Sequence, residues 1–185
     1  MSLRLKDFEV TLKGETLIGP LSLEVEGGDI LSVMGPSGSG KSSLLNAIIG
    51  EIAFPFSVTG QVFVDDLDVG DLPVGKRKIG ILYQDDLLFP HMTVGENLLF
   101  AIPQQYSSHD REKLMRQALS DAHLEGFENR DPATLSGGQR ARVSCMRMLL
   151  SQPQAILLDE PFSKLDADLK ERFRRFVFDL GKDRN

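Results

Sequence analysis

One short stretch constrains this chain more than any other. Residues 35–42 read Gly-Pro-Ser-Gly-Ser-Gly-Lys-Ser and satisfy the pattern G-x-x-x-x-G-K-[ST]. Glycines let a backbone curl until several N–H groups point at one anion, and a helix N-terminus adds partial positive charge. The apolar run Ile30–Met34 before the motif predicts a buried parallel strand, and the apolar face after it predicts a helix over Lys41–Ile49. This order predicts a phosphate site; the alternative is a chance match in a glycine-rich turn.

The residues of this loop divide the work of holding phosphates. Lys41 supplies a full charge to the β- and γ-phosphates of a nucleotide, and Ser42 offers its hydroxyl to Mg²⁺. The predicted cradle consists of Gly35, Pro36, Ser37, Gly38, Ser39, Gly40, Lys41, Ser42 and Ser43.

The spacing of apolar residues predicts an α/β fold with a parallel sheet and helices on both of its faces. Alternating apolar residues over 8–12, 21–25 and 62–64 predict the strands of a small antiparallel sheet. Ile79–Tyr83 and Ala155–Leu158 are apolar enough to be buried strands, the second in a central position. Helical spacing is found over 111–124, 139–150 and 166–180, and the stretch from about 92 to 134 reads as an inserted helical subdomain.

Charge and hydropathy narrow the possible partners. The net charge of −6 argues against non-specific binding to nucleic acid or to an anionic membrane surface. No apolar run approaches the roughly 18–20 residues that cross a bilayer, so an action at a membrane would need a partner. The single cysteine, Cys145, cannot form an internal disulfide and is expected to be a buried thiol.

A pair of acidic residues follows the apolar run Ala155–Leu158. Open α/β sheets place their chemistry at the carboxyl ends of strands, which is where Asp159 and Glu160 fall. Asp159 could hold Mg²⁺ through a water molecule, and Glu160 could polarise an attacking water as a general base. The alternative is a solvated acidic turn.

A further motif, Leu135–Gln139 (LSGGQ), precedes the amphipathic stretch 139–150. In the order phosphate loop, Gln84, LSGGQ, ILLDEP and SKLD, the motifs of residues 35–166 resemble those of the ATP-binding cassette (ABC) ATPases, and in particular of importer-type subunits such as the YnjD-like bacterial group. The resemblance implies that residues 1–185 form one nucleotide-binding domain with a P-loop NTPase core, an N-terminal antiparallel β subdomain and a helical subdomain over about 92–138. It also implies ATP and Mg²⁺ as ligands and ATP hydrolysis as the reaction.

The resemblance extends to individual residues. Gln84 is similar to the glutamine that contacts Mg²⁺ and the attacking water, so that Glu160, Gln84 and Lys41 would be catalytic, and Ser42, Gln84 and Asp159 would serve the metal. In that family two copies of the chain form a head-to-tail homodimer. The ATP bound to the phosphate loop of one copy is then covered at its γ-phosphate by residues of the other copy. The capping residues here would be Ser136, Gly137, Gly138 and Gln139, with Asp166 crossing the interface beside the partner's loop.

The same resemblance implies a membrane partner. The region Gln84–Asn97 would receive a transmembrane permease subunit, and a solute-binding protein would act indirectly, at the cytoplasmic face of the membrane. Asp85 and Asp86 would either meet basic residues there or form a solvated acidic turn. Two alternatives to solute import are a soluble, non-transport ABC ATPase, which would carry a coiled-coil insertion or a second cassette, and a regulatory nucleotide-binding module with little turnover. No transported solute is predicted.

The sequence departs from the family pattern at two places. The position of the aromatic residue that stacks on adenine falls near Leu12, which leaves the recognition of adenine open. After the predicted 166–180 helix the family has a further strand with a histidine that contacts the γ-phosphate, whereas His91, His109 and His123 all precede Glu160. We therefore expect a truncated chain or, alternatively, a naturally short subunit. We expect this chain either to have low stability or to fill the gap left by the further strand by other means, and to hydrolyse ATP slowly.

Overall fold

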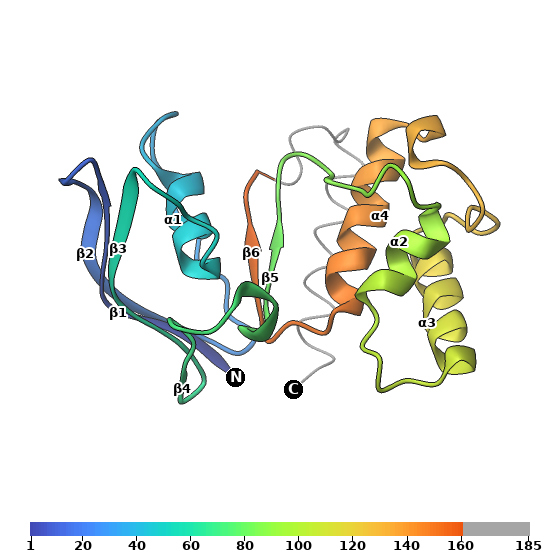
Figure 1. Cartoon of the computed structure of the whole chain (residues 1–185), viewed down its shortest axis with the longest axis horizontal. Helices are drawn as coiled ribbons and strands as arrows, with labels where there is room; N and C mark the ends of the chain where they lie inside the picture. Colours follow the sequence, from blue (N-terminus) through green and yellow to red (C-terminus); the bar gives the residue numbers. More distant parts are fainter. Residues whose placement is uncertain (161–185) are drawn as a thin grey trace. The chain divides into compact units, whose positions relative to one another are not determined.

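The computed structural model describes residues 1–160, which cluster into two compact units (Figure 1). The first unit contains Met1–Ile81 and Gln154–Asp159, and the second contains Leu82–Pro153 and Glu160. The predicted helix over 166–180 and the predicted interface residue Asp166 lie outside the described residues.

An antiparallel sheet forms much of the first unit. Its strands are β1 (Ser2–Leu12), β2 (Glu15–Glu26), β3 (Phe56–Val64) and β4 (Leu67–Asp68), in the spatial order β2-β1-β3-β4. In the register, Val10 of β1 lies opposite Ile18 of β2 and Val58 of β3. Phe8 and Val10 are buried, as expected for a sheet that packs one face on a core. The predicted antiparallel sheet is confirmed.

Helix α1 (Lys41–Ile49) begins directly after the glycine-rich loop. It ends at Gly50, whose φ of 84° lies in the left-handed region that glycine adopts at helix C-termini, as the sequence predicts. Its buried residues join those of the sheet in one core, which contains Leu5, Phe8, Val10, Leu44, Ala47, Ile48, Ile49, Val62, Val64, Val69, Ile79 and Leu157. This core holds the helix that carries the loop.

Two further strands lie side by side and run in the same direction (Figure 1). They are β5 (Ile79–Leu82), preceded by the short 3₁₀ helix η1 (Val74–Lys76), and β6 (Ala155–Leu158). Both predicted strands are therefore confirmed. Among residues 1–160, however, β6 pairs with β5 alone, and Ile156 and Leu158 are each 36% exposed. The central position predicted for β6 is not found among these residues.

The predicted buried strand Ile30–Met34 is wrong for the structure. These residues adopt no regular secondary structure, and Ile30 and Met34 are 58% and 90% exposed. The apolar composition is right for a strand, but a strand also needs a neighbour to accept and donate its backbone hydrogen bonds. No strand within the described residues pairs with this segment.

The second unit is helical and contains α2 (Val94–Ala101), α3 (Ser108–Asp121), the 3₁₀ helix η2 (Pro132–Thr134) and α4 (Gly137–Leu150). Helices α2 and α3 both contact α4. The predicted 111–124 helix starts earlier because the Ser107 side chain caps its first turn. The predicted 139–150 helix starts at Gly137 for the same reason, with Ser136 as the cap. Over the described part of the chain, none of the helices has the length and hydropathy of a membrane span.

Candidate functional site

The glycine-rich loop adopts the left-handed backbone that its glycines permit. Gly38 and Gly40 have φ values of 79° and 89°, and Gly40 is the residue that precedes α1. A Cβ atom added to Gly35 would come within 2.8 Å of the Ser39 hydroxyl. Glycine is therefore favoured at Gly40 by its conformation, whereas a side chain at Gly35 would require the Ser39 hydroxyl to move.

Lys41 and Ser42 stand at the start of α1. The Lys41 ammonium lies over the loop, because Nζ donates to the carbonyls of Gly35 at 2.9 Å and Pro36 at 2.8 Å. The first backbone hydrogen bond of the helix runs from Leu44 to Gly40 at 2.8 Å. The N–H groups of Lys41, Ser42 and Ser43 precede that hydrogen-bond ladder and form the positive end of the helix.

These groups fit the phosphates of a nucleotide. The loop brings together helix N–H groups, an ammonium and the exposed Ser42 hydroxyl, which are donors suited to an anion rather than ligands suited to a metal alone. Within residues 1–160, no three or more His, Cys, Asp or Glu side chains gather as a metal site. Mg²⁺ usually keeps water and phosphate oxygens with only one or two protein ligands, so the Ser42 hydroxyl suits a metal that arrives with the nucleotide.

Two aliphatic residues beside the loop are missed by reasoning from sequence. A Cβ atom added to Gly40 would meet Ile18 Cδ1 at 3.0 Å and the Leu17 Cγ at 3.2 Å. Both residues belong to β2, whereas Leu12, at the expected stacking position, ends β1. The register of β2 in the sheet places Leu17 and Ile18 next to the loop, and no pattern in the neighbouring sequence predicts this position.

The acidic pair lies at the end of β6, as predicted. Asp159 is half-buried and Glu160 is exposed, with a φ of 45° that non-glycine residues seldom adopt. Among the described residues, no hydrogen bond or ion pair joins Asp159 to the phosphate loop. The carboxylates are available to solvent and to a ligand.

The LSGGQ segment forms a capped helix start. The Ser136 N–H donates to the Gln139 side-chain oxygen at 2.9 Å, and the Gln139 N–H donates to the Ser136 hydroxyl at 3.3 Å. This reciprocal capping box sets Gly137 and Gly138 in the first turn of α4. The glycines expose backbone N–H groups at the positive end of a helix, which is an arrangement suited to an anion.

Gln84 follows β5 and its side chain is exposed. Two residues later, Asp86 forms an ion pair within the chain, because the Arg140 Nε donates to its Oδ2 at 2.7 Å. For Asp86, the solvated acidic turn is therefore wrong, whereas a contact with a basic membrane partner stays a prediction. The reason is that a residue 54 positions away supplies the charge, and sequence proximity gives no sign of it.

Asn97 holds the segment between Gln84 and α2 in place. Its buried side chain accepts a hydrogen bond from the Phe89 N–H at 2.9 Å and donates to the carbonyls of Phe89, Met92 and Thr93. Nearby apolar side chains remain exposed: Leu87 is 57% and Phe100 is 63% exposed, and Phe100 packs edge-on against Phe89 at 5.0 Å. Phe100 lies outside the predicted region 84–97 and extends its apolar surface.

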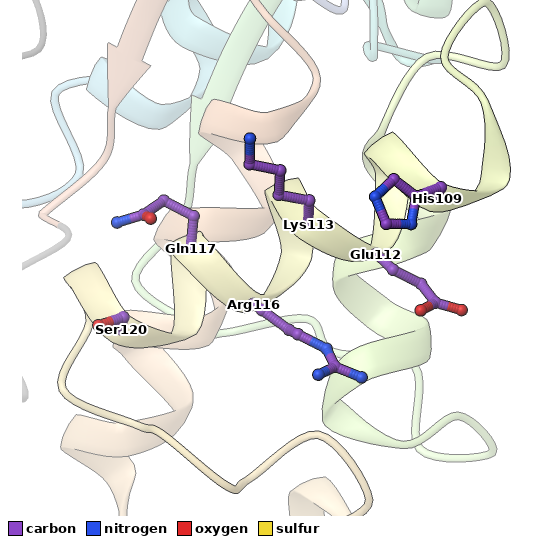
Figure 2. A pocket seen from close by; sticks show the side chains of 6 residues that line it. All are labelled: His109, Glu112, Lys113, Arg116, Gln117 and Ser120. Atoms are coloured by element: carbon purple, nitrogen blue, oxygen red, sulfur yellow. The ribbon is translucent and has the colours of Figure 1, made fainter.

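A surface pocket on α3 is separate from these residues. Its lining residues are His109, Glu112, Lys113, Arg116, Gln117 and Ser120, which all project from one helix (Figure 2). None of the predicted site residues lines it. Cys145 is buried in α4, as expected, and burial raises the pKa of its thiol well above its usual range.

Comparison with known proteins agrees with the motifs. The model of the ABC transporter family matches residues 18–163. The chain is 47% identical to the ABC transporter ATP-binding protein YnjD of Escherichia coli over 94% of its own length and 80% of that protein. It is 38% identical to the spermidine/putrescine import ATP-binding protein PotA of Bacillus cereus and 36% to the sulfate/thiosulfate import ATP-binding protein CysA 2 of Agrobacterium fabrum. It spans about half of these two relatives (51% and 53%).

The fold has close counterparts among solved structures. The dimeric structure of the ATP-binding cassette MJ0796 in a post-hydrolysis state with ADP and Pi matches with a TM-score of 0.82 and 32% identity. The match covers 98% of this chain and 83% of the cassette. A second dimeric structure of MJ0796, described as a bacterial ABC transporter cassette, gives the same values. The chain belongs to the ABC transporter family and is an ATPase subunit that uses ATP and Mg²⁺.

Proposed function

We propose that this chain energises solute import through a membrane permease, by ATP-driven head-to-tail dimerisation of two copies. The observation that carries the proposal is that two separate helix starts, the loop before α1 and the capped glycines before α4, present N–H groups suited to an anion. One ATP needs one of each, and a head-to-tail pair of chains would supply both. The dimeric structures of MJ0796 support dimerisation.

In this proposal each site residue has a distinct task. The loop residues 35–43 hold the phosphates, with Lys41 as the counter-charge and Ser42, Gln84 and Asp159 serving Mg²⁺. Glu160 polarises the attacking water. Residues 136–139 of the second copy cap the γ-phosphate, and its Asp166 would cross the interface beside this chain's phosphate loop.

The proposed permease surface comprises residues 84–97 together with the exposed Phe100. Exposed apolar residues such as Leu87 and Phe100 are typical of a surface that another protein covers. The import relatives PotA and CysA 2 support the direction of transport. The chain would then act as a peripheral protein on the cytoplasmic face of the membrane, with a solute-binding protein on the far side.

The dimer is tested with Glu160→Gln in the full-length chain. Slowed hydrolysis should trap ATP between two copies, so we expect ATP and Mg²⁺ to convert a monomer into a dimer in sedimentation velocity. Adding Lys41→Ala should abolish this conversion, because the phosphates lose their counter-charge. A chain that binds ATP with Glu160→Gln and stays monomeric would overturn the dimer and favour a regulatory nucleotide-binding module.

The permease surface needs its own test. A permease whose gene neighbours that of this chain should co-purify with the chain, and Phe100→Ala combined with Leu87→Ala should weaken that capture about tenfold or more. Phe54→Ala is a matched control, because Phe54 is 96% exposed but lies in the first unit. Import itself is decided by ATP-dependent solute uptake into right-side-out vesicles that contain ATP; ATP-dependent uptake into inverted vesicles would indicate export and contradict it.

A further inference from the structure

Two arginines of α4 hold the segment that follows Gln84. Arg140 and Arg147 are seven residues apart, which is about two helical turns, so they project from the same side of α4 at a separation of about 10.5 Å along its axis. Arg140 pairs with Asp86, and the Arg147 guanidinium lies 5.0 Å from the centre of the Phe89 ring. Asp86 and Phe89 are three residues apart and can span at most about 10 Å, which matches the separation of the arginines.

Arg140 has a second acceptor. While its Nε donates to Asp86, its Nη1 donates to the backbone carbonyl of Leu135 at 2.7 Å. Leu135 is the first residue of the LSGGQ segment, and Ser136 after it begins the capping box. One planar guanidinium thus joins the Gln84 segment to the LSGGQ segment, with two donors that point in different directions.

Arg147 contacts the part of the segment 84–89 that lies around Phe89. Arg147 Nη1 lies 3.4 Å from the Asn97 side-chain oxygen, which also accepts the Phe89 N–H. Burial lowers the pKa of the Arg147 guanidinium, and the negative charge of Asp86 partly offsets this. Asp86 therefore interacts with both arginines, by a direct pair with Arg140 and by charge with Arg147.

We propose that Arg140 and Arg147 are positioning residues that bind the segment 84–89 to α4, so that Gln84 and the LSGGQ segment move as one piece. Under the proposed function, on which this inference rests, one end of that piece borders the permease surface and the other caps the ATP of the second copy. A displacement of segment 84–89 would then reach residues 135–139 through Asp86 and Arg140, because Arg140 also donates to the Leu135 carbonyl.

The test uses Asp86→Asn, Arg140→Gln and their combination, each in the Glu160→Gln chain. Amide hydrogen exchange should rise in both 84–89 and 135–139 for either single variant. The dissociation constant of the ATP-bound dimer should rise about tenfold, whereas ATP affinity of the monomer should change by less than about twofold. If Asp86 acts through Arg140, the combined variant loses no more than Arg140→Gln alone.

Matched controls come from the polar face of α3. Glu112→Gln and Arg116→Gln remove the same charges, one helical turn apart on an exposed face (Figure 2). Neither should alter exchange in 84–89 or 135–139. Arg140→Lys keeps the charge but has a single donor group, so its dimer affinity should lie between those of Arg140→Gln and the parent chain. A dimer affinity equal to that of the parent would overturn the role of the planar guanidinium.

The outcomes separate this inference from the proposed function. Exchange that rises only in the segment carrying the substitution, or losses that simply add in the combined variant, would overturn the inference even if the dimer forms. A parent chain that does not dimerise with ATP contradicts the proposed function, and the exchange measurement still decides the inference. Thermal unfolding of each variant identifies one that fails to fold, in which case Asp86→Glu and Arg140→Lys replace the larger changes.

Discussion

Arg77 donates a hydrogen bond from Nη1 to the backbone carbonyl of Ile48, 2.9 Å away, near the C-terminal end of α1. The same side chain donates to the carbonyls of Leu72 and Gly70. It is buried, and desolvation lowers its pKa while Asp71 and Asp68 oppose that shift. One guanidinium therefore anchors the far end of the helix whose other end forms the phosphate loop.

Arg77→Met should lower the free energy of unfolding by about 3 kcal/mol, because buried carbonyls lose their donors. Urea denaturation measures this. The helix should also lose its fixed position, so ATP affinity should fall together with stability. Arg77→Lys, which keeps a charge but not the fork, should recover less than half of the loss; a loss below about 1 kcal/mol for Arg77→Met would show that water replaces the guanidinium.

Gly50→Ala tests the contact between Arg77 and the C-terminal end of α1 by changing the helix end instead of the arginine. Gly50 has a φ of 84°, and an added Cβ atom would lie 2.4 Å from the Arg77 Cζ. We expect a loss of at least about 2 kcal/mol, from the left-handed strain together with displacement of Arg77. Gly75→Ala is the control, since Gly75 has nothing within 4 Å of the added atom and no positive φ. Equal unfolding midpoints for the two variants would contradict the argument.

Local patterns predicted most of the secondary structure because they act over a few residues. The phosphate loop, α1 and its stop at Gly50 follow from glycine, lysine and apolar spacing that are contiguous in the chain. The strand predicted at 30–34 fails because strand formation depends on a distant partner, whereas the local composition is ambiguous between a buried strand and an exposed segment. Pairing partners are not encoded in the run itself.

The same limit applies to the site. The capping box at Ser136 is readable, since Ser and Gln stand three residues apart before a helix. The sequence does not predict the ion pair of Asp86 with Arg140 or the approach of Ile18 to Gly40, because both join residues far apart in the chain. Motifs therefore identify the chemistry of the site, and tertiary packing decides which side chains support it.

Cys145 should make stability fall at high pH. Burial raises the pKa of its thiol, so the folded state keeps the proton that the unfolded state releases above a pKa of about 8.5. The unfolded state then binds fewer protons, and stability decreases with pH by up to about 1.4 kcal/mol per unit above that value. Comparing urea unfolding at pH 8 and pH 10 with that of Cys145→Ala isolates the thiol, because alanine removes its share of the slope; an unchanged slope would contradict it.

Two capping boxes allow stability to be separated from function. Thr93 and Ser136 both accept a hydrogen bond from the third helical residue and receive one in return. Thr93→Ala and Ser136→Ala should each cost about 1 kcal/mol of stability. Only Ser136→Ala should also weaken ATP-driven dimerisation of the Glu160→Gln chain, since it alone borders the proposed γ-phosphate cap. Equal dimer affinities would place the cap elsewhere.

Asn97 should prove the most sensitive residue of the permease surface, although it is buried. Its amide bonds both the N–H and the carbonyl of Phe89 and also reaches Met92 and Thr93, so no residue with only acceptors or only donors can replace it. Asn97→Asp keeps the shape but faces three carbonyls with an acceptor, and should cost at least about 3 kcal/mol. Asn97→Leu should cost a similar amount by leaving the carbonyls unpaired.

At a temperature where Asn97→Asp remains folded, permease capture should fall more than ATP affinity, because the loop carrying Phe89 is released while the phosphate loop lies in the other unit. Loss of ATP affinity in proportion to capture would show that Asn97 supports the whole domain and not the surface alone.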